Sequence, residues 1–213
     1  MESKKVWSET AKLVEAAGRE APLARVLSEV VSAARAITSE GCRAALYLHD
    51  LGAACLNLGV NGGLPQGYVD AVQGFKVAEE QPACGRVAYL GAEDIVPEIR
   101  LDARWQPYSG LADAHAIQAC WSFPLLSEIG VLGTLAVYHE VPTAPTSAQA
   151  ETLRYLATIA AAAVERSRRE SVYQDELKQL PVTADFSPSG RRSGTGSESI
   201  MAYMRTNSAG RST

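Results

Sequence analysis

The spacing of apolar residues predicts a one-sided helix near the start of the chain. Between residues 23 and 37 they recur three and four positions apart, which is the spacing of one face of a helix. Pro22 precedes this run, where a missing backbone N–H costs nothing, and Gly41 follows it as a stop. The apolar face consists of Leu23, Val26, Leu27, Val30, Val31, Ala34 and Ile37.

A second long helix is predicted in the last third of the chain. Ser147 is a suitable N-cap, and the same kind of apolar stripe follows it up to Val164. The charged residues beyond Arg166 contain no proline or glycine before Pro181, so we expect the helix to continue to about residue 180. A shorter helix is expected within residues 1–20.

Two pairs of strand-length apolar runs indicate two hairpins. Residues 42–49 and 53–60 are joined at Asp50-Leu51-Gly52, which suits a tight reversal. Residues 119–126 and 131–140 flank a second turn, and the last of these runs is nearly all apolar, as in a central strand.

The segment between the two hairpins has weaker periodicity. Residues 64–80 are expected to form irregular cover over one sheet face, with a helical turn at 66–72. A short helix at 84–90 and a brief strand at 94–96 follow. Residues 98–115 mix charged, aromatic and turn-forming types, which predicts a long, partly helical loop of the kind that carries function.

Composition places the chain among ordinary globular proteins. Hydrophobic residues make up 46% and charged residues 21%, and the formal net charge is -4. Such a charge gives no basic field for nucleic acid or an anionic membrane surface, so neither is an expected partner. Charges are scattered through the first twenty residues, and no run of about 20 apolar residues occurs. We therefore expect a cytoplasmic protein.

These patterns divide the chain into four parts. We expect an N-terminal helix at 1–20, a folded domain at 21–167 and a helical extension at 168–180. Residues 181–213, rich in Ser, Gly and Arg, have too few large apolar side chains to offset the entropy of ordering, which predicts disorder.

Six stretches, in order along the chain, resemble the bacterial GAF family. They lie at residues 82–89, 94–97, 103–105, 119–125, 130–138 and 157–166. The resemblance implies an α+β fold with a central antiparallel sheet of about six strands, helices on one face and ligand-covering loops on the other. It also implies homodimers formed by the N- and C-terminal helices. Members of the family usually regulate histidine kinases, cyclic-nucleotide enzymes or transcription activators. Their ligands include cyclic nucleotides, tetrapyrroles, nitrate and small acids.

Large amphipathic side chains near the expected pocket are the first candidates for ligand contact. Trp105 and His115 lie in the predicted loop at 98–115, and Trp121 and Tyr138 lie on predicted strands. Core packing is the competing role, above all for the two strand residues. Asp94 opens the short strand; it could bind a cation or a ligand donor, although anchoring loop N–H groups is the role we favour.

Cys84 is the candidate for reactive chemistry. It begins a predicted short helix, whose exposed N–H groups and dipole would lower the thiol pKa if the residue were exposed. A small buried core residue is the alternative. The four cysteines, Cys42, Cys55, Cys84 and Cys120, form no CxxC pair, and the histidines are far apart, so no metal site is predicted. A bilin would usually require a histidine close after the cysteine, where this chain has Gly85 and Arg86. No cofactor is identified.

The sequence Cys84-Gly85 also resembles a sequence of the free methionine-R-sulfoxide reductases, which are enzymes with the GAF fold. Their chemistry needs a thiolate, a resolving cysteine and acidic groups. This chain has no acid at 119–124 or 134–138, and no cysteine between 97 and 115. We therefore expect a regulatory binding domain that is not an enzyme, with an unidentified small-molecule ligand and a separate signalling partner such as a histidine kinase or transcription regulator. The reductase and a ligand-free adaptor module are the alternatives.

Overall fold

The structure is a computed structural model that describes residues 21–38 and 41–179. The helix predicted within 1–20 and the disordered tail predicted at 181–213 lie outside the described residues. The chain divides into two compact units with a boundary after Asp175. The fold described below is that of the first unit.

An antiparallel sheet of six strands forms the centre of this unit. Its spatial order is β3 (Phe75–Lys76), β2 (Cys55–Gly62), β1 (Arg43–Asp50), β6 (Gly130–His139), β5 (Ala119–Ser127) and β4 (Asp94–Val96). The apolar β6 is central, as predicted, and the two hairpins are the expected ones. The α+β class and the antiparallel sheet are confirmed. Strand β3 was not predicted, because two residues are too few for a period of two to be visible.

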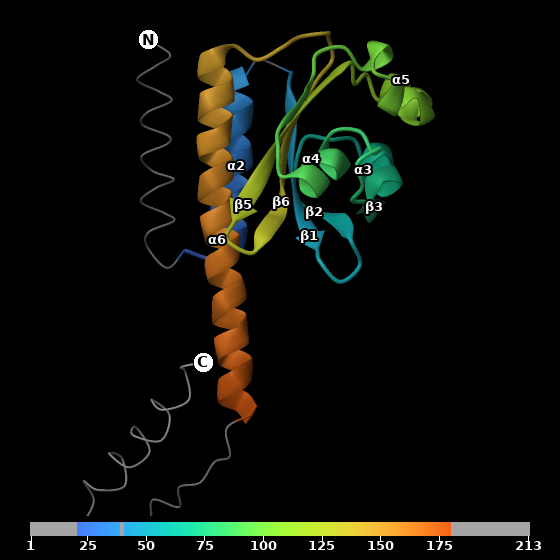
Figure 1. Cartoon of the computed structure of the whole chain (residues 1–213). Helices are drawn as coiled ribbons and strands as arrows, with labels where there is room; N and C mark the ends of the chain where they lie inside the picture. Colours follow the sequence, from blue (N-terminus) through green and yellow to red (C-terminus); the bar gives the residue numbers. More distant parts are fainter. Residues whose placement is uncertain (1–20, 39–40, 180–213) are drawn as a thin grey trace, which may run out of the picture. The chain divides into compact units, whose positions relative to one another are not determined.

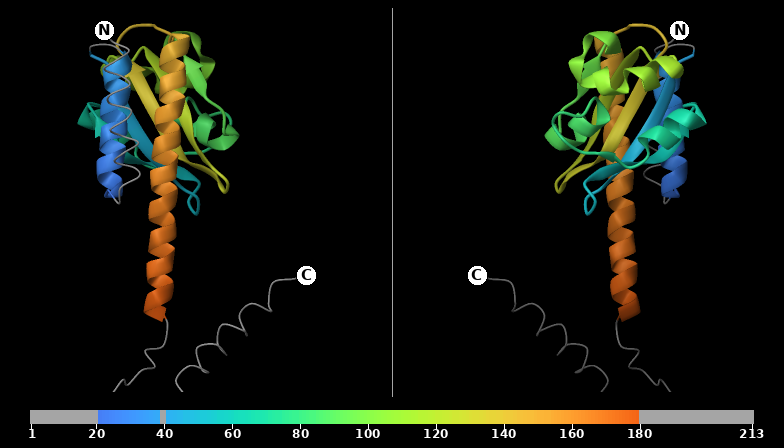
Figure 2. Two further views of the ribbon diagram at one scale, coloured as in Figure 1. Left: turned by 90° about the vertical axis from the view of Figure 1, so that its left-hand side faces the viewer. Right: turned by 90° about the vertical axis from the view of Figure 1, so that its right-hand side faces the viewer.

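Two long helices pack on one face of this sheet, which we call the helix face (Figures 1 and 2). They are α2 (Leu23–Thr38) and α6 (Ser147–Gln179). The apolar stripe of α2 is buried as its spacing predicts, and from α6 Leu153 and Leu156 join the same core. The strands contribute every second residue, since successive side chains point to opposite faces. From β6 these are Leu135 and Val137.

Short helices and loops cover the opposite face, which we call the pocket face (Figure 2). We refer to the parts of residues 64–118 outside strands β3 and β4 as the cover. Its helical turns at 66–72 and 84–90 are where the sequence predicted them. The remaining short helices lie in the segment 98–115, which was expected to be a partly helical loop. The helical elements are α3 (Gln66–Val72), α4 (Cys84–Leu90), η1 (Ile99–Leu101), η2 (Ala103–Tyr108) and α5 (Ser109–Ala114).

Two glycines allow close approaches between backbone segments. A Cβ on Gly133 of β6 would lie 2.1 Å from the carbonyl oxygen of Tyr47, on the neighbouring strand β1. A Cβ on Gly85 would lie 2.7 Å from the carbonyl oxygen of Lys76, so this glycine lets α4 lie against the chain that leaves β3. Both contacts are with backbone, which cannot rotate away, and larger residues are excluded there.

Helix α6 continues without a break past the sheet. Arg168 still contacts the domain, because its guanidinium donates to the carbonyl oxygen of His49 at 2.8 Å. Val172 and Tyr173, one turn further on, are each 59% exposed. No helix within 21–38 and 41–179 combines the length and the apolar character needed to cross a membrane.

Candidate functional site

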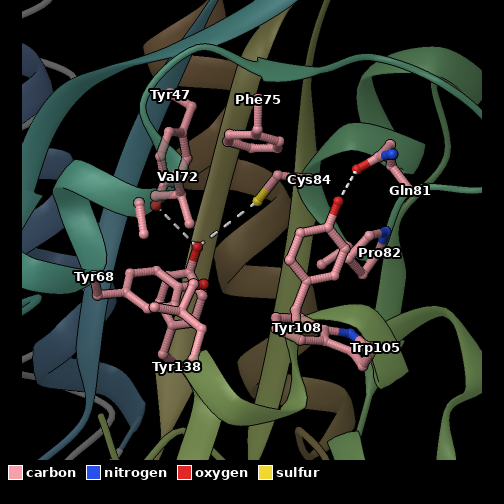
Figure 3. A pocket seen from close by; sticks show the side chains of 13 residues that line it. Tyr47, Tyr68, Val72, Phe75, Gln81, Pro82, Cys84, Trp105, Tyr108 and Tyr138 are labelled. Carbon is pink, nitrogen blue, oxygen red and sulfur yellow. Dashed lines mark hydrogen bonds between the residues drawn. The ribbon is translucent and has the colours of Figure 1, made fainter. Parts of the chain in front are cut away.

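A pocket lies between the pocket face of the sheet and the cover (Figure 3). This partly open pocket has a volume of about 50 Å³, enough for a few water molecules. The sheet supplies the floor and the cover supplies the walls. The lining residues are Tyr47, Tyr68, Ala71, Val72, Phe75, Gln81, Pro82, Ala83, Cys84, Trp105, Tyr108, Leu111 and Tyr138.

Two tyrosines from the central strands form the polar centre of the floor. Tyr47 of β1 and Tyr138 of β6 both point to the pocket face, and their hydroxyl oxygens are 3.1 Å apart. Two further rings meet them edge to face: Phe75 lies 5.3 Å from the ring of Tyr47, and Tyr68 lies 5.7 Å from that of Tyr138. Burial raises the pKa of both floor tyrosines, so the phenols stay protonated.

Cys84 is buried at the start of α4, beside this floor. Its thiol accepts a hydrogen bond from the Ser122 hydroxyl at 3.2 Å and lies 4.0 Å from the Tyr138 hydroxyl oxygen. Burial raises the pKa of the Cys84 thiol, and the hydrogen bond from Ser122 offsets this only in part. Cys84 is therefore the small buried residue given as the alternative, and the lowered thiol pKa, which required an exposed residue, does not apply. The Cys120 thiol is also buried, and its pKa is raised for the same reason.

The rim of the pocket is closed by a hydrogen bond between two segments of the cover. The half-buried Tyr108 of η2 donates its hydroxyl hydrogen to Oε1 of Gln81, which precedes α4, at 2.7 Å. Trp105, also in η2, is buried against the pocket, and its Nε1 has no hydrogen-bond partner among the described residues. The buried indole N–H is thus a donor without an acceptor, which is unusual in a protein interior.

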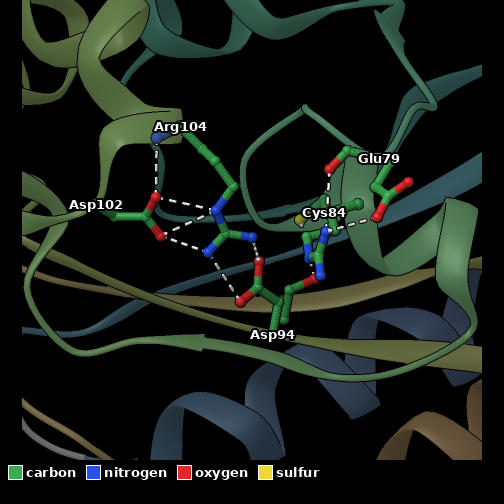
Figure 4. Close-up of polar contacts among 7 residues, drawn as sticks. Glu79, Cys84, Asp94, Asp102 and Arg104 are labelled. Atoms are coloured by element: carbon green, nitrogen blue, oxygen red, sulfur yellow. Dashed lines mark hydrogen bonds and ion pairs between the residues drawn. The ribbon is translucent and has the colours of Figure 1, made fainter.

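A charged cluster anchors this part of the cover to the edge of the sheet (Figure 4). The Arg104 guanidinium donates to both carboxylate oxygens of Asp94, at 2.6 and 3.2 Å, and pairs with the carboxylate of Asp102. Asp102 also accepts from the backbone N–H of Arg104 at 2.9 Å. The hydrogen bonds from Arg104 hold the pKa of Asp102 below its ordinary value. Because Trp105 follows Arg104 directly, the cluster fixes a pocket wall.

The structure brings three of the six predicted site residues to the pocket: Cys84, Trp105 and Tyr138. Asp94 does not line it. Instead, this residue anchors the cover, the role favoured from its position, although through the Arg104 side chain and not through loop N–H groups.

Trp121 and His115 do not reach the pocket. Trp121 lies on the helix face, where its ring packs 4.1 Å from that of His139 and its Nε1 donates to the carbonyl oxygen of Thr143. The expectation of pocket contact ignored the alternation along β5, which sends residue 121 away from the pocket. His115 does not line the pocket but packs next to a residue that does, since its ring lies 5.9 Å from that of Tyr68.

Several lining residues are not among those predicted from the sequence. Tyr47, Tyr68 and Tyr108 are of the same amphipathic type as the predicted residues, but they were not singled out. Tyr47 could have been found from the strand pattern, because it alternates with Leu46 and Leu48, which face the helices. Tyr68 and Gln81 lie in the segment without clear periodicity, where no such signal exists.

The described residues contain no group of three or more His, Cys, Asp or Glu side chains that could hold a metal ion. The lining instead offers aromatic rings, hydroxyl groups, one amide and one thiol. Such a set binds through ring contacts and neutral hydrogen bonds.

Comparison with known proteins identifies the fold and the family. The family model described as GAF domain matches residues 20–165. A search of curated proteins finds no match.

Solved structures of similar fold come from proteins with different roles. The GAF domain of a phosphoenolpyruvate-protein phosphotransferase from Coxiella burnetii has a TM-score of 0.66 and 15% identity, covering 78% of this chain and 96% of its own. A domain of a protein described as a two-component sensor histidine kinase from Sinorhizobium meliloti has a TM-score of 0.59 and 18% identity. The match covers 70% of this chain and 95% of that domain.

An enzyme is also among them. The free methionine-R-sulfoxide reductase from Neisseria meningitidis, in complex with its substrate, has a TM-score of 0.62 and 17% identity, covering 78% of this chain and 91% of its own. The fold thus occurs both in domains of a phosphotransferase and a histidine kinase and in a reductase. With the sheet order, the pocket and a family match over more than half of its residues, the chain belongs to the GAF domain family.

Proposed function

We propose that this GAF domain senses a small molecule, which binds in the pocket between the sheet and the cover. The observation that carries the proposal is the composition of the lining: aromatic rings surround a few converging polar groups, as in small-molecule sites generally. The rim consists of two cover segments joined by the Tyr108–Gln81 hydrogen bond, which a ligand can replace.

The sheet offers a direct mechanical link from the pocket to the long helices. On β6, Tyr138 faces the pocket, and its neighbour Val137 faces the helix core. A ligand that prefers one arrangement of floor and cover would shift the packing of α2 and α6. Only the difference in its affinity for the two arrangements can drive that change.

The output is proposed to be pairing of the flanking helices in a homodimer, read by a separate signalling protein such as a histidine kinase or a transcription regulator. The exposed turns of α6 beyond Arg168 favour this role, because Val172 and Tyr173 present large apolar surface to solvent. Sedimentation of the full chain should give the mass of a dimer at micromolar concentrations. A monomer mass measured at concentrations well above micromolar would contradict helix pairing.

The domain is further proposed not to be an enzyme. A reductase would need a thiolate at pH 7, whereas burial raises the pKa of both Cys84 and Cys120. It would also need carboxylates to hold the substrate ammonium, and no Asp or Glu is among the lining residues. The reductase remains the second candidate because of the fold shared with the Neisseria enzyme. A ligand-free adaptor module is the third.

Native mass spectrometry of freshly purified protein tests the sensing proposal. A retained small molecule, lost in a Trp105→Ala variant but kept in a Tyr155→Phe variant on exposed α6 surface, is the expected result. Persistent absence of any ligand across expression hosts and metabolite screens would favour the adaptor. NADPH-coupled reduction of free methionine sulfoxide tests the enzyme: activity in the wild type that Cys84→Ser abolishes would overturn the proposal.

A further inference from the structure

We propose that the ligand is an uncharged molecule with a single planar ring and a hydrogen-bond acceptor, and that it enters by breaking the Tyr108–Gln81 hydrogen bond. This inference rests on the proposed function, since it names the chemical class that the same pocket selects.

The absence of charge around the pocket is the first argument. None of the thirteen lining side chains is an Asp, Glu, Lys, Arg or His. A charged ligand enclosed there would lose its hydration without gaining a counter-ion, which is costly in a site of low polarity.

Two arginines close in the chain to the lining residues Trp105 and Cys84 are already paired with carboxylates. Arg104 is held between Asp94 and Asp102, and Arg86 lies 3.8 Å from Glu79 and donates to its carbonyl oxygen. Figure 4 shows the Arg104 guanidinium turned toward its two carboxylates. Recruiting Arg104 to an anionic ligand would leave two partly buried carboxylates unpaired, so the cluster does not supply a counter-ion.

The arrangement of rings indicates a flat ligand. Tyr47 with Phe75 and Tyr68 with Tyr138 form two edge-to-face pairs on one side of the pocket. In Figure 3, Tyr108 and Trp105 stand on the other side, across from Tyr68 and Tyr138. A ring placed between these walls would contact aromatic surface on two sides, which favours planar over branched ligands.

Two donors set the hydrogen-bonding group of the ligand. Gln81 uses its Oε1 to accept from Tyr108, and its Nε2 donates to no described residue. Trp105 Nε1 also lacks an acceptor among the described residues, but it is fully buried, so a ligand would reach it only after the rim has opened. The floor hydroxyls already bond to each other. An acceptor on the ligand, such as a carbonyl oxygen or a ring nitrogen, would satisfy a donor that the protein leaves open.

The size of the pocket explains why the rim must open. Its volume of about 50 Å³ is well below the roughly 150 Å³ of an engineered apolar cavity that binds benzene. One ring therefore needs additional room. Tyr108 and Gln81 are half-buried residues on separate cover segments, so parting them widens the pocket without disturbing the sheet.

Matched one-ring compounds test the class of ligand. Benzamide, benzoate and benzylamine share a ring and differ in charge, and titration calorimetry with the full chain would compare them at pH 7. We expect benzamide to bind at least about tenfold more tightly than either ion. Benzoate or benzylamine binding as tightly as benzamide would overturn this inference and leave the sensing proposal intact. Binding of a cyclic nucleotide, with no binding of a neutral one-ring compound, would also overturn this inference and leave the sensing proposal intact. If none of these compounds bound and no ligand were retained on purification, both proposals would fail.

Two variants test the entry route. Gln81→Glu keeps the shape and the acceptor for Tyr108 but removes the amide donor and adds a charge, so benzamide affinity should fall about tenfold or more. Tyr108→Phe keeps the ring and removes the rim hydrogen bond, so stopped-flow association should become faster. Tyr155→Phe on exposed α6 is the matched control and should change neither. Unaltered affinity in Gln81→Glu, with a wild-type melting temperature and circular dichroism spectrum, would contradict the assignment of the site. An unchanged association rate in Tyr108→Phe would contradict the rim as the entry route.

Discussion

The two faces of the sheet differ in the chemistry of what they bury. On the helix face, the core is almost entirely aliphatic side chains of α2, α6 and alternate strand residues. On the pocket face, the buried residues include Tyr47, Tyr68, Tyr138 and Trp105, together with the thiols of Cys84 and Cys120. Buried hydroxyl groups require partners, and the Tyr47–Tyr138 and Ser122–Cys84 hydrogen bonds supply them for these three hydroxyl groups.

Under the proposed function, this difference would separate stability from ligand binding within one small domain. An aliphatic core packs densely and leaves little room for change. A face lined with rings and satisfied hydroxyl groups can exchange protein hydrogen bonds for ligand hydrogen bonds at small net cost. The same strands therefore connect a rigid layer, which carries the long helices, to an adaptable one.

The largest expected effect comes from truncating the helix face. Leu135→Ala removes a fully buried side chain of β6 and should lower the free energy of unfolding by about 2–5 kcal/mol, because it leaves a cavity against α2 and α6. Val72→Ala in the partly open pocket wall is the matched control, with an expected loss of about 1 kcal/mol or less. Urea denaturation measures both. Equal losses would mean that the two faces do not differ in packing.

Arg104→Ala should have the next largest effect. It leaves two partly buried carboxylates without their partner, which should cost about 1–3 kcal/mol. Arg100→Ala is the control, since its pair with Asp113 is exposed and should contribute less than about 1 kcal/mol. The loss in Arg104→Ala should appear first as faster hydrogen exchange in η2, measured by mass spectrometry. Slow exchange in η2 despite the substitution would argue against the cluster as the anchor of this pocket wall.

The same cluster predicts a dependence of stability on pH. The pKa of Asp102 is lowered in the folded state, so its ionised form stabilises the fold above its unfolded pKa of about 4, and this contribution is lost as the pH falls through the lower folded pKa. The stability difference between wild type and Asp102→Asn should therefore be constant from pH 5 to 7 and shrink in more acid solution. A difference that grows with acidity would mean that the ionised Asp102 carboxylate does not stabilise the fold.

Removing one floor hydroxyl should have a smaller effect. Tyr138→Phe leaves the buried Tyr47 hydroxyl, a single neutral group, without its 3.1 Å partner and should cost about 1 kcal/mol or slightly more. Tyr173→Phe on the exposed part of α6 should leave the melting temperature unchanged. If Tyr138→Phe also weakens binding of the retained ligand, the floor hydroxyls contact it. A melting temperature equal to that of the wild type would mean that the hydrogen bond contributes nothing.

The smallest effect concerns thiol reactivity, and it leaves stability unchanged. Cys84 and Cys120 are buried with raised pKa values, whereas Cys55 is only half-buried. A thiol reagent at pH 8 should label Cys55 first, and Cys55→Ser should remove this fast phase. Cys84 should react only when the protein unfolds. Rapid labelling of Cys84, identified by peptide mass, would favour the reductase as the function of this domain.

The sequence predicted most elements but only part of the site. The helix at 23–37, both hairpins and the brief strand at 94–96 follow from local patterns and are present. Trp121 was misplaced because its face depends on the register of β5 against β6, where residue 121 pairs with Val137. Tyr68 and Tyr108 line opposite sides of the same pocket only because the cover folds back over β1 and β6, which no local pattern encodes.

By itself, the sequence determined which residues form helices and strands, and its motifs indicated the family. Apolar periodicity does this because it reports which face of an element is buried. The tertiary structure decided which side chains converge, and hence that Cys84 is enclosed and protonated, that Asp94 binds Arg104, and that no charged side chain lines the pocket. These properties depend on distances and burial between segments far apart in the chain, which spacing along the sequence does not record.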